Sequence, residues 1–282
     1  DKAKELMDTE GLTFVHPYDD PATISGQGTI GLEMLTDQPD LDHIIVPIGG
    51  GGVLSGTTLA AKALKPDIRM HGVEAELFPS MYQAIHDQEP TSGGASIADG
   101  IAVKRPGKLT KRIITDLVED ITLCDEPVLE NAVAIMADYQ KVVAEGAGAS
   151  PLAALMQNRE RFRGKKVGLV ICGGNIDTRL LASVMMRGIV RDGRLVRLRI
   201  DINDAPGVLA KVSGIIGDTG ANIVEVYHQR LFHDVPVRKA EIDTVVETRN
   251  RDHVREIVDA LEAGGFRTRM LSTLSADGPS QP

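Results

Sequence analysis

The sequence contains no tryptophan, and aromatic residues make up only 3% of it. It has two cysteines, Cys124 and Cys172, which are too few for a disulfide framework and fit the reducing cytoplasm, where we expect the protein. No run of 18 or more apolar residues is present, so the sequence predicts no membrane-spanning helix. No charged segment followed by an apolar one opens the chain, and we therefore expect no signal peptide.

Positive charge is also in short supply. Lysine and arginine total 31 against 40 aspartate and glutamate residues, which gives a net charge of −9. Phosphate backbones and acidic lipids repel a negative chain, so we expect neither nucleic acid nor a membrane as a partner. The 282 residues, 42% of them apolar, suffice for about two domains of ordinary size.

A run of four consecutive glycines, Gly49–Gly52, lies between two regular patterns. The apolar run His43–Val46 before it is typical of a short buried strand, and the spacing from Val53 to Leu64 predicts a helix. Consecutive glycine amides can converge on one anion, and a helix start adds its positive dipole end. The segment has neither the Lys-Ser/Thr of a nucleoside-triphosphate loop nor G-x-G-x-x-G spacing, so the expected ligand is a phosphate monoester. A tight turn without a ligand is the alternative.

A second strand that ends in glycines lies farther along the chain. Lys166–Asn175 is predicted to be a buried strand that ends in Cys-Gly-Gly-Asn. Ligands of open α/β sheets bind at such strand ends. Strands alternate with helices through this part of the chain, starting with a short strand predicted at Leu12–Val15, and this order predicts a parallel sheet with helices on both faces.

The pattern changes in the last third of the chain. Leu195–Ile202 alternates apolar and polar residues, which is typical of a half-exposed strand. Further strands are predicted at Asn222–Gln229, Lys239–Glu247 and Arg267–Leu271, with helices at Val208–Asp218 and Asp252–Ala263. The order βαββαβ predicts a ferredoxin-like module.

Several motifs occur together in this sequence and carry a family resemblance. They are Pro47–Gly56 with its four glycines, Gly72-Val73-Glu74, Ile97–Ile101, Glu145–Ala149 and Cys172–Asp177. In this order they resemble the threonine ammonia-lyase (threonine dehydratase) family of fold-type II pyridoxal-phosphate enzymes, over about residues 1–186. Asp204–Leu209 and Gly220–Ile223 resemble an ACT domain, a regulatory amino-acid sensor. The resemblance implies a lyase domain at 1–188, a linker at 189–194, an ACT domain at 195–274 and a tail at 275–282.

The resemblance also implies a cofactor site. The family's glycine loop holds the phosphate of pyridoxal 5'-phosphate, which here corresponds to Gly49, Gly50, Gly51, Gly52 and the amide of Val53. Cys172 corresponds to the residue that faces the pyridine nitrogen. A thiol does not keep that nitrogen protonated as a carboxylate would, so the ring is a weaker electron sink, and β-elimination from a hydroxy amino acid is favoured. Without the resemblance, Cys172 also fits a small buried hydrophobic residue.

The implied reaction is the deamination of L-threonine to 2-oxobutanoate and ammonia, with L-serine giving pyruvate, by a carbon–nitrogen lyase. The family's Schiff-base lysine lies in a Ser-x-Lys-x-Arg-Gly motif, followed by Ser-Ala-Gly-Asn-His, and the sequence contains neither. We therefore expect a C-terminal portion of the family's fold that lacks the N-terminal part and is inactive alone. A non-catalytic amino-acid-sensing fragment, or a serine dehydratase, serine racemase or threonine synthase of the same fold, is the alternative.

A metal site is not expected. Relatives bind a divalent cation through a carboxylate at the position of Glu74, a carbonyl at Phe78 and an aspartate at the position of Ser80. That aspartate is absent here, and two oxygen ligands with water make a poor site for a hard cation. Asp99 and Glu145 match family motifs, but solvated or helix-capping roles fit them as well.

The ACT segment contains a candidate effector site. Its residues are Asp204, Pro206, Gly207, Val208, Asn222 and Ile223. The first amides of the helix that begins near Val208 can receive a carboxylate, and the Asn222 amide can meet the same ligand. A branched-chain amino acid is the expected effector if the enzyme is biosynthetic, and ACT modules commonly pair between chains, so we expect a homo-oligomer. The alternative is a capping turn in a module that serves only for dimerisation.

Overall fold

The computed structural model describes residues 2–229 and 239–271. The chain divides into two compact units, Asp1–Leu180 and Leu181–Pro282, here called unit 1 and unit 2. The predicted fold class is confirmed, because unit 1 has a parallel sheet with helices on both faces and unit 2 has an antiparallel βαββαβ arrangement. The domain boundaries given above remain predictions, and the predicted tail at 275–282 lies outside the described residues.

Unit 1 is built on a parallel sheet with the strand order β3-β2-β1-β4. The strands are β1 (His43–Pro47), β2 (Arg69–Ala75), β3 (Asp120–Cys124) and β4 (Val167–Leu169). All five residues of β1 are buried, as expected for an apolar strand in the middle of a parallel sheet. The strand predicted at Leu12–Val15 does not form, and these four residues are exposed.

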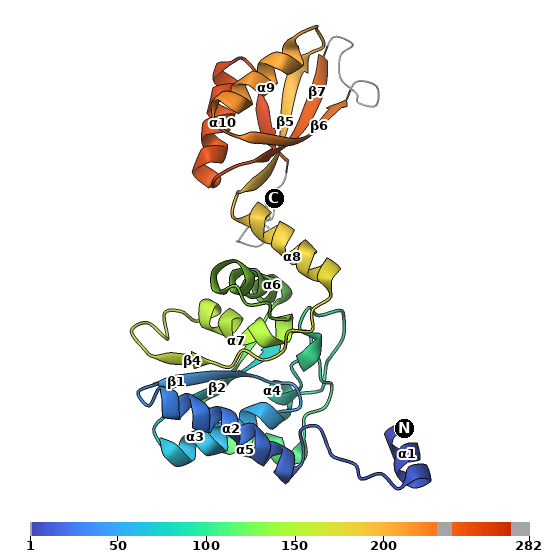
Figure 1. Cartoon of the computed structure of the whole chain (residues 1–282), viewed down its shortest axis with the longest axis vertical. Helices are drawn as coiled ribbons and strands as arrows, with labels where there is room; N and C mark the ends of the chain where they lie inside the picture. Colours follow the sequence, from blue (N-terminus) through green and yellow to red (C-terminus); the bar gives the residue numbers. More distant parts are fainter. Residues whose placement is uncertain (1, 230–238, 272–282) are drawn as a thin grey trace. The chain divides into compact units, whose positions relative to one another are not determined.

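Helices cover both faces of this sheet. The helices of unit 1 are α1 (Lys2–Glu10), α2 (Pro21–Asp37), α3 (Gly52–Leu64), α4 (Ser80–Ile85), α5 (Lys108–Leu117), α6 (Glu126–Ile135) and α7 (Gly146–Gln157), with a short 3-10 helix η1 (Asp99–Ile101) and a π-helix η2 (Met136–Gln140). Figure 1 shows α2, α3 and α5 on one face and α6 and α7 on the other. The Asp20 carboxylate starts α2 by accepting hydrogen bonds from the amides of Ala22 and Thr23.

Helices α2 and α3 approach each other through backbone atoms. A Cβ atom on Gly31 would lie 2.5 Å from the carbonyl oxygen of Thr57, and one on Gly56 would lie 2.1 Å from that of Ile24. Only glycine leaves room for this approach. The contact fixes α3, the helix that follows the glycine run, directly against α2.

A buried polar row crosses the amino ends of three neighbouring strands. The Nδ1 atom of His43 on β1 lies 2.8 Å from Nε2 of His71 on β2, and the other ring nitrogen of His71 meets the carboxylate of Asp120 on β3. Arg161 pairs with the same carboxylate. Burial is the main cause that lowers the pKa of His43, so the His43 ring is neutral at neutral pH. The row lies at the opposite end of β1 from the glycine run.

Unit 2 contains the predicted ferredoxin-like module. Its elements are β5 (Leu195–Asn203), α9 (Val208–Asp218), β6 (Asn222–Gln229), β7 (Lys239–Glu247), α10 (Arg251–Ala263) and β8 (Thr268–Met270), preceded by α8 (Thr178–Arg191), which begins in unit 1. The sheet is antiparallel in the order β6-β7-β5-β8. Alternate residues of β5, from Val196 to Ile202, are buried against α9 and α10, which accounts for the sequence alternation.

The other face of this sheet carries charged side chains in a dense ion-pair network. Asp243, in the middle of β7, accepts hydrogen bonds from Arg197 at 2.8 Å and from Arg199 at 2.7 and 2.9 Å. Arg269 bridges Asp201 and Glu241. The side chain of Asp243 has no exposed area, and two guanidinium groups compensate its charge.

Candidate functional site

The glycine loop, Gly49–Gly52, connects β1 to α3 and has unpaired backbone donors. Within the described residues, the N–H groups from Gly49 to Val53 donate to no protein acceptor. Gly51 has a φ of 94°, a left-handed conformation that favours glycine. The Gly50 carbonyl accepts hydrogen bonds from the Gly107 amide at 3.2 Å and the Thr110 hydroxyl at 2.7 Å. Unpaired amides at a helix start are the geometry expected for binding a phosphate group.

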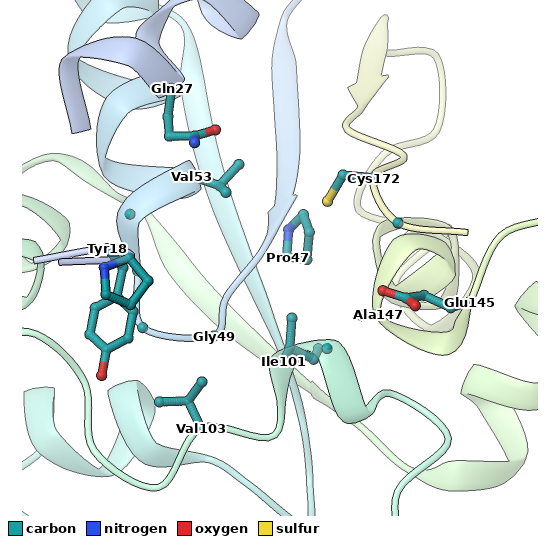
Figure 2. Close-up of a pocket in the computed structure, with 16 residues that line it drawn as sticks. Tyr18, Gln27, Pro47, Gly49, Val53, Ile101, Val103, Glu145, Ala147 and Cys172 are labelled. Carbon is teal, nitrogen blue, oxygen red and sulfur yellow. The ribbon is translucent and has the colours of Figure 1, made fainter. Parts of the chain in front are cut away.

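These amides border a pocket of about 260 Å³ in unit 1. Residues from other segments of unit 1 complete its wall: Pro17, Tyr18, Gln27, Pro47, Gly100, Ile101, Val103, Glu145, Ala147, Cys172 and Gly173. Figure 2 labels most of them. The pocket therefore lies at the carboxyl end of β1, where parallel sheets bind their ligands. None of the described residues that line it is a lysine.

Cys172 lies in the wall opposite the glycine loop (Figure 2). Burial raises the pKa of its thiol, and the nearby charge of Glu145 raises the same pKa further, so the thiol is neutral at neutral pH. The Glu145 carboxylate lies close to the α-carbons of Gly100 and Gly173, where a Cβ would come within 2.7 and 2.2 Å of its Oε1 atom. The wall opposite the glycine loop therefore places a neutral thiol and a carboxylate next to a ligand bound at the loop.

The predicted cofactor residues lie close to one another. The structure brings the four glycines, Val53 and Cys172 into one pocket. It also places Glu145 there, whereas Asp99 is exposed at the start of η1. Sequence reasoning missed Tyr18 and Gln27, which approach the loop from segments before β1 and which no local spacing rule identifies.

Glu74, the carboxylate considered for a metal site, has other partners. The two carboxylate oxygens of Glu74 accept hydrogen bonds from the amides of Met81 at 2.8 Å and Tyr82 at 2.9 Å, at the start of α4. Burial raises the pKa of Glu74 to about 7, against the opposing effect of these amides. Glu74 thus serves as the helix cap of α4. The expectation that no metal binds here remains a prediction.

The candidate effector residues lie in unit 2 around the start of α9. Gly207 has a φ of 86°, and its position has open space where a Cβ would be. The residue at the N-cap of α9 is Gly207, which has no side chain to cap the helix. The Val208 amide donates a hydrogen bond to the Ala205 carbonyl at 3.3 Å. Asn222, on the neighbouring strand β6, donates a hydrogen bond to Glu247 at 3.3 Å. Two of the groups predicted to meet the ligand, the Val208 amide and the Asn222 side chain, therefore already have partners.

Comparison with known proteins assigns both units. Residues 1–173 match the family described as pyridoxal-phosphate dependent enzyme, and residues 196–263 match the ACT domain. The chain is 40% identical over 271 residues to an L-threonine ammonia-lyase of Thermotoga maritima, and 38% identical over 273 residues to one of Geobacter sulfurreducens. Each alignment covers 95% of this chain and 67% of the relative. This chain belongs to the pyridoxal-phosphate-dependent enzymes.

Solved structures of the pyridoxal-phosphate-dependent enzymes show the same fold. The processed form of threonine deaminase isoform 2 from Solanum lycopersicum is 28% identical with a TM-score of 0.61, covering 65% of this chain and 55% of that one. A maize serine racemase is 34% identical with a TM-score of 0.60, covering 66% and 59%. The chain thus spans about two thirds of the length of its curated relatives and less of these structures. In the part of the chain that the structure describes, no helix is long and apolar enough to cross a bilayer.

The cofactor of this enzyme family, pyridoxal 5'-phosphate, fits the pocket. Its phosphate matches the unpaired amides of the glycine loop, and the pocket volume of about 260 Å³ extends from there to Cys172. The individual roles of the loop residues and of Cys172 remain predictions.

Proposed function

We propose that this chain forms the cofactor-phosphate part of a threonine ammonia-lyase. Such an enzyme converts L-threonine to 2-oxobutanoate and ammonia, and L-serine to pyruvate and ammonia, by β-elimination. The observation that carries the proposal is a pocket in which unpaired loop amides face a neutral thiol. The L-threonine ammonia-lyases at 38 and 40% identity support the choice of substrate.

The residues of this chain have distinct roles in the proposal. The amides from Gly49 to Val53 bind the phosphate and thereby orient the ring. The neutral thiol of Cys172 leaves the ring nitrogen without the proton that a carboxylate would hold there. Burial, with the charge of Glu145 as a second cause, raises the pKa of the thiol and keeps it protonated. When bound, the cofactor supplies the electron sink that allows the β-hydroxyl group to leave. The proposal assigns the Schiff-base lysine to the family's Ser-x-Lys-x-Arg-Gly segment, a motif that this chain does not contain.

Two measurements test this proposal. The chain should bind pyridoxine 5'-phosphate, which has the phosphate but no aldehyde to react with surface lysines, more tightly than it binds pyridoxine. Joined to the family segment that carries Ser-x-Lys-x-Arg-Gly, it should release ammonia from L-threonine. Failure to release ammonia from either L-threonine or L-serine would contradict the lyase assignment. Conversion of L-serine to D-serine without release of ammonia would favour a serine racemase, the alternative that the similarity to the maize serine racemase suggests.

The proposal includes regulation through unit 2. A branched-chain amino acid is proposed to bind with its carboxylate at the start of α9, where Gly207 leaves open space. The amides that follow Val208 would receive this carboxylate. Pairing of unit 2 between two copies of the chain would place this effector site next to a homo-oligomer interface. Coupling of ~1–3 kcal/mol would change threonine affinity by roughly 5- to 150-fold. A cytoplasmic location belongs to the same proposal and fits the two free cysteines.

Calorimetric titration of the whole chain with isoleucine, valine, serine and threonine tests the effector site. Isoleucine or valine should release heat, and Gly207→Ala should abolish that heat, because the new Cβ occupies the open helix start. Gly265→Ala is the matched control, since Gly265 also has a φ of 86° and open space for a Cβ but lies beyond the end of α10. Absence of heat with all four amino acids, or equal binding by both variants, would leave unit 2 as a dimerisation module.

A further inference from the structure

The segment just before α2 is fixed in place by hydrogen bonds at both ends. The Nδ1 atom of His16 accepts hydrogen bonds from the amides of Tyr18 at 3.3 Å and Asp19 at 2.8 Å. The Asp19 carboxylate in turn accepts from the amides of Lys108, Leu109 and Thr110 at the start of α5. Burial alone would raise the pKa of Asp19, but these three amides outweigh it and hold that pKa below its usual value. We call residues 16–19 the strap.

The strap places the aromatic ring of Tyr18 directly on the glycine loop. A Cβ on Gly50 would lie 2.1 to 2.3 Å from three ring atoms of Tyr18, so the ring is in contact with the α-carbon of Gly50. A Cβ on Gly52 would lie 2.9 Å from the Tyr18 α-carbon. The Tyr18 hydroxyl donates a hydrogen bond to the Arg105 carbonyl at 3.2 Å, and the His16 ring packs edge-on at 4.6 Å between centroids. Tyr18 is thus restrained at its hydroxyl group, at its backbone amide and by the packing of its ring against His16.

The strap also positions one of the two hydrogen-bond donors to the Gly50 carbonyl. Asp19 caps the start of α5, and Thr110 in that first turn donates its hydroxyl to the Gly50 carbonyl at 2.7 Å. The α-carbon and the carbonyl oxygen of Gly50 are therefore both restrained by groups that the strap positions. A glycine without such restraints samples many backbone conformations, and the loop amides would then point in different directions.

We propose that Tyr18 is a positioning residue whose ring holds Gly50 so that the amides of the glycine loop converge on the cofactor's phosphate. This inference rests on the proposed function, because it takes the loop as the phosphate site. It assigns to Tyr18 no contact with substrate. The flat ring is the essential feature, because ring atoms lie directly against the bare α-carbon of Gly50, and the hydroxyl serves to orient the ring.

Three variants of the whole chain distinguish the effect of the Tyr18 ring from the effect of its hydroxyl group and from the effect of losing any tyrosine. Tyr18→Ala removes the ring, Tyr18→Phe keeps the ring and removes the hydroxyl, and Tyr139→Ala removes a tyrosine that is 72% exposed outside the pocket. If Tyr18→Ala does not fold, Tyr18→Leu, which is apolar but not planar, replaces it with the same expected outcome. Relaxation of ¹⁵N-glycine signals from residues 49–52 reports loop order, and titration with pyridoxine 5'-phosphate and pyridoxine reports phosphate binding.

The order parameters of the glycine loop should be near the rigid value of about 0.85 in the unmodified chain and in the variants Tyr18→Phe and Tyr139→Ala. In Tyr18→Ala they should fall below ~0.6. Tyr18→Ala should also bind pyridoxine 5'-phosphate about tenfold more weakly, because the loop must be ordered on binding, with pyridoxine affinity unchanged. Unchanged loop order in Tyr18→Ala, unchanged phosphate affinity, or an equal loss in Tyr18→Phe would each overturn the role of Tyr18. If the unmodified chain itself shows no preference for the phosphate ester, the proposed function fails first and this inference with it.

Discussion

Gly51→Ala should abolish the preference of this chain for pyridoxine 5'-phosphate over pyridoxine. Gly51 has a φ of 94°, which costs an alanine roughly 1–2 kcal/mol. Its Cβ would also lie 2.7 Å from Cε of Met81, 2.9 Å from Cβ of Thr110 and 3.0 Å from Cδ1 of Ile114. Relief of these contacts requires the start of α3 to shift, which misplaces the loop amides. Crowding of this kind adds about 1–3 kcal/mol to the loss of stability.

Gly164→Ala is the matched control for this experiment. Gly164 also has a positive φ, 71°, but a Cβ there would meet nothing within 4 Å. It therefore shares the backbone strain without the crowding and lies outside the pocket. Urea unfolding should show a loss of stability in both variants, larger in Gly51→Ala because of the crowding. Titration should show that phosphate binding is lost only in Gly51→Ala. Equal phosphate binding by the two variants would show that the conformation at Gly51 does not matter for the ligand.

Asp243→Ala should destabilise unit 2 by roughly 3 kcal/mol, because it leaves the positive charges of Arg197 and Arg199 without their buried carboxylate partner. Asp243 is fully covered, whereas Arg199 and Arg197 are 21% and 45% exposed, so water compensates part of the loss. Asp252→Ala is the control, because its pair with Arg255 has a similar 2.7 Å distance but side chains that are 83% and 75% exposed. Such a surface pair contributes about 0–1 kcal/mol. Urea unfolding followed by circular dichroism measures both losses.

The effect of Asp243→Ala should depend on pH with a definite sign. The hydrogen bond from Arg199 is the main cause that lowers the pKa of Asp243 below its ordinary value of 3.8. A depressed carboxyl pKa stabilises the folded state above the unfolded-state value, and this stabilisation disappears as pH falls through the folded-state value. The difference between the unmodified chain and Asp243→Ala should therefore be full at pH 7 and shrink below about pH 4. A difference that stays constant to pH 3 would contradict an ionic role.

The ferredoxin-like module and the glycine loop were predictable because local patterns determine them. Alternation of apolar and polar residues predicted the strand at Leu195–Ile202, which lies within β5. The strands predicted at Asn222–Gln229 and Lys239–Glu247 have the bounds of β6 and β7. No pattern in the sequence reveals that Arg197 and Arg199 both pair with Asp243. A strand was wrongly predicted at Leu12–Val15, because local propensity ignores whether a partner strand lies nearby.

The tertiary restraints on the pocket were not predictable from the sequence. Tyr18 and Gly50 touch although 32 positions separate them, and Asp19 caps a helix that begins about ninety residues later. No periodicity or motif spacing connects such segments. The candidate site was therefore predicted through its glycines and Cys172, while the residues that fix their geometry became visible only in the structure.

The backbone contact between α2 and α3 has a consequence for ligand affinity. Contacts made by side chains leave alternative rotamers that a ligand must freeze, whereas Gly31 and Gly56 have no rotamers to lose. The start of α3, with its loop amides, therefore has few alternative positions before any ligand arrives. Binding then costs little ordering entropy, and even a small anion meets a preorganised site.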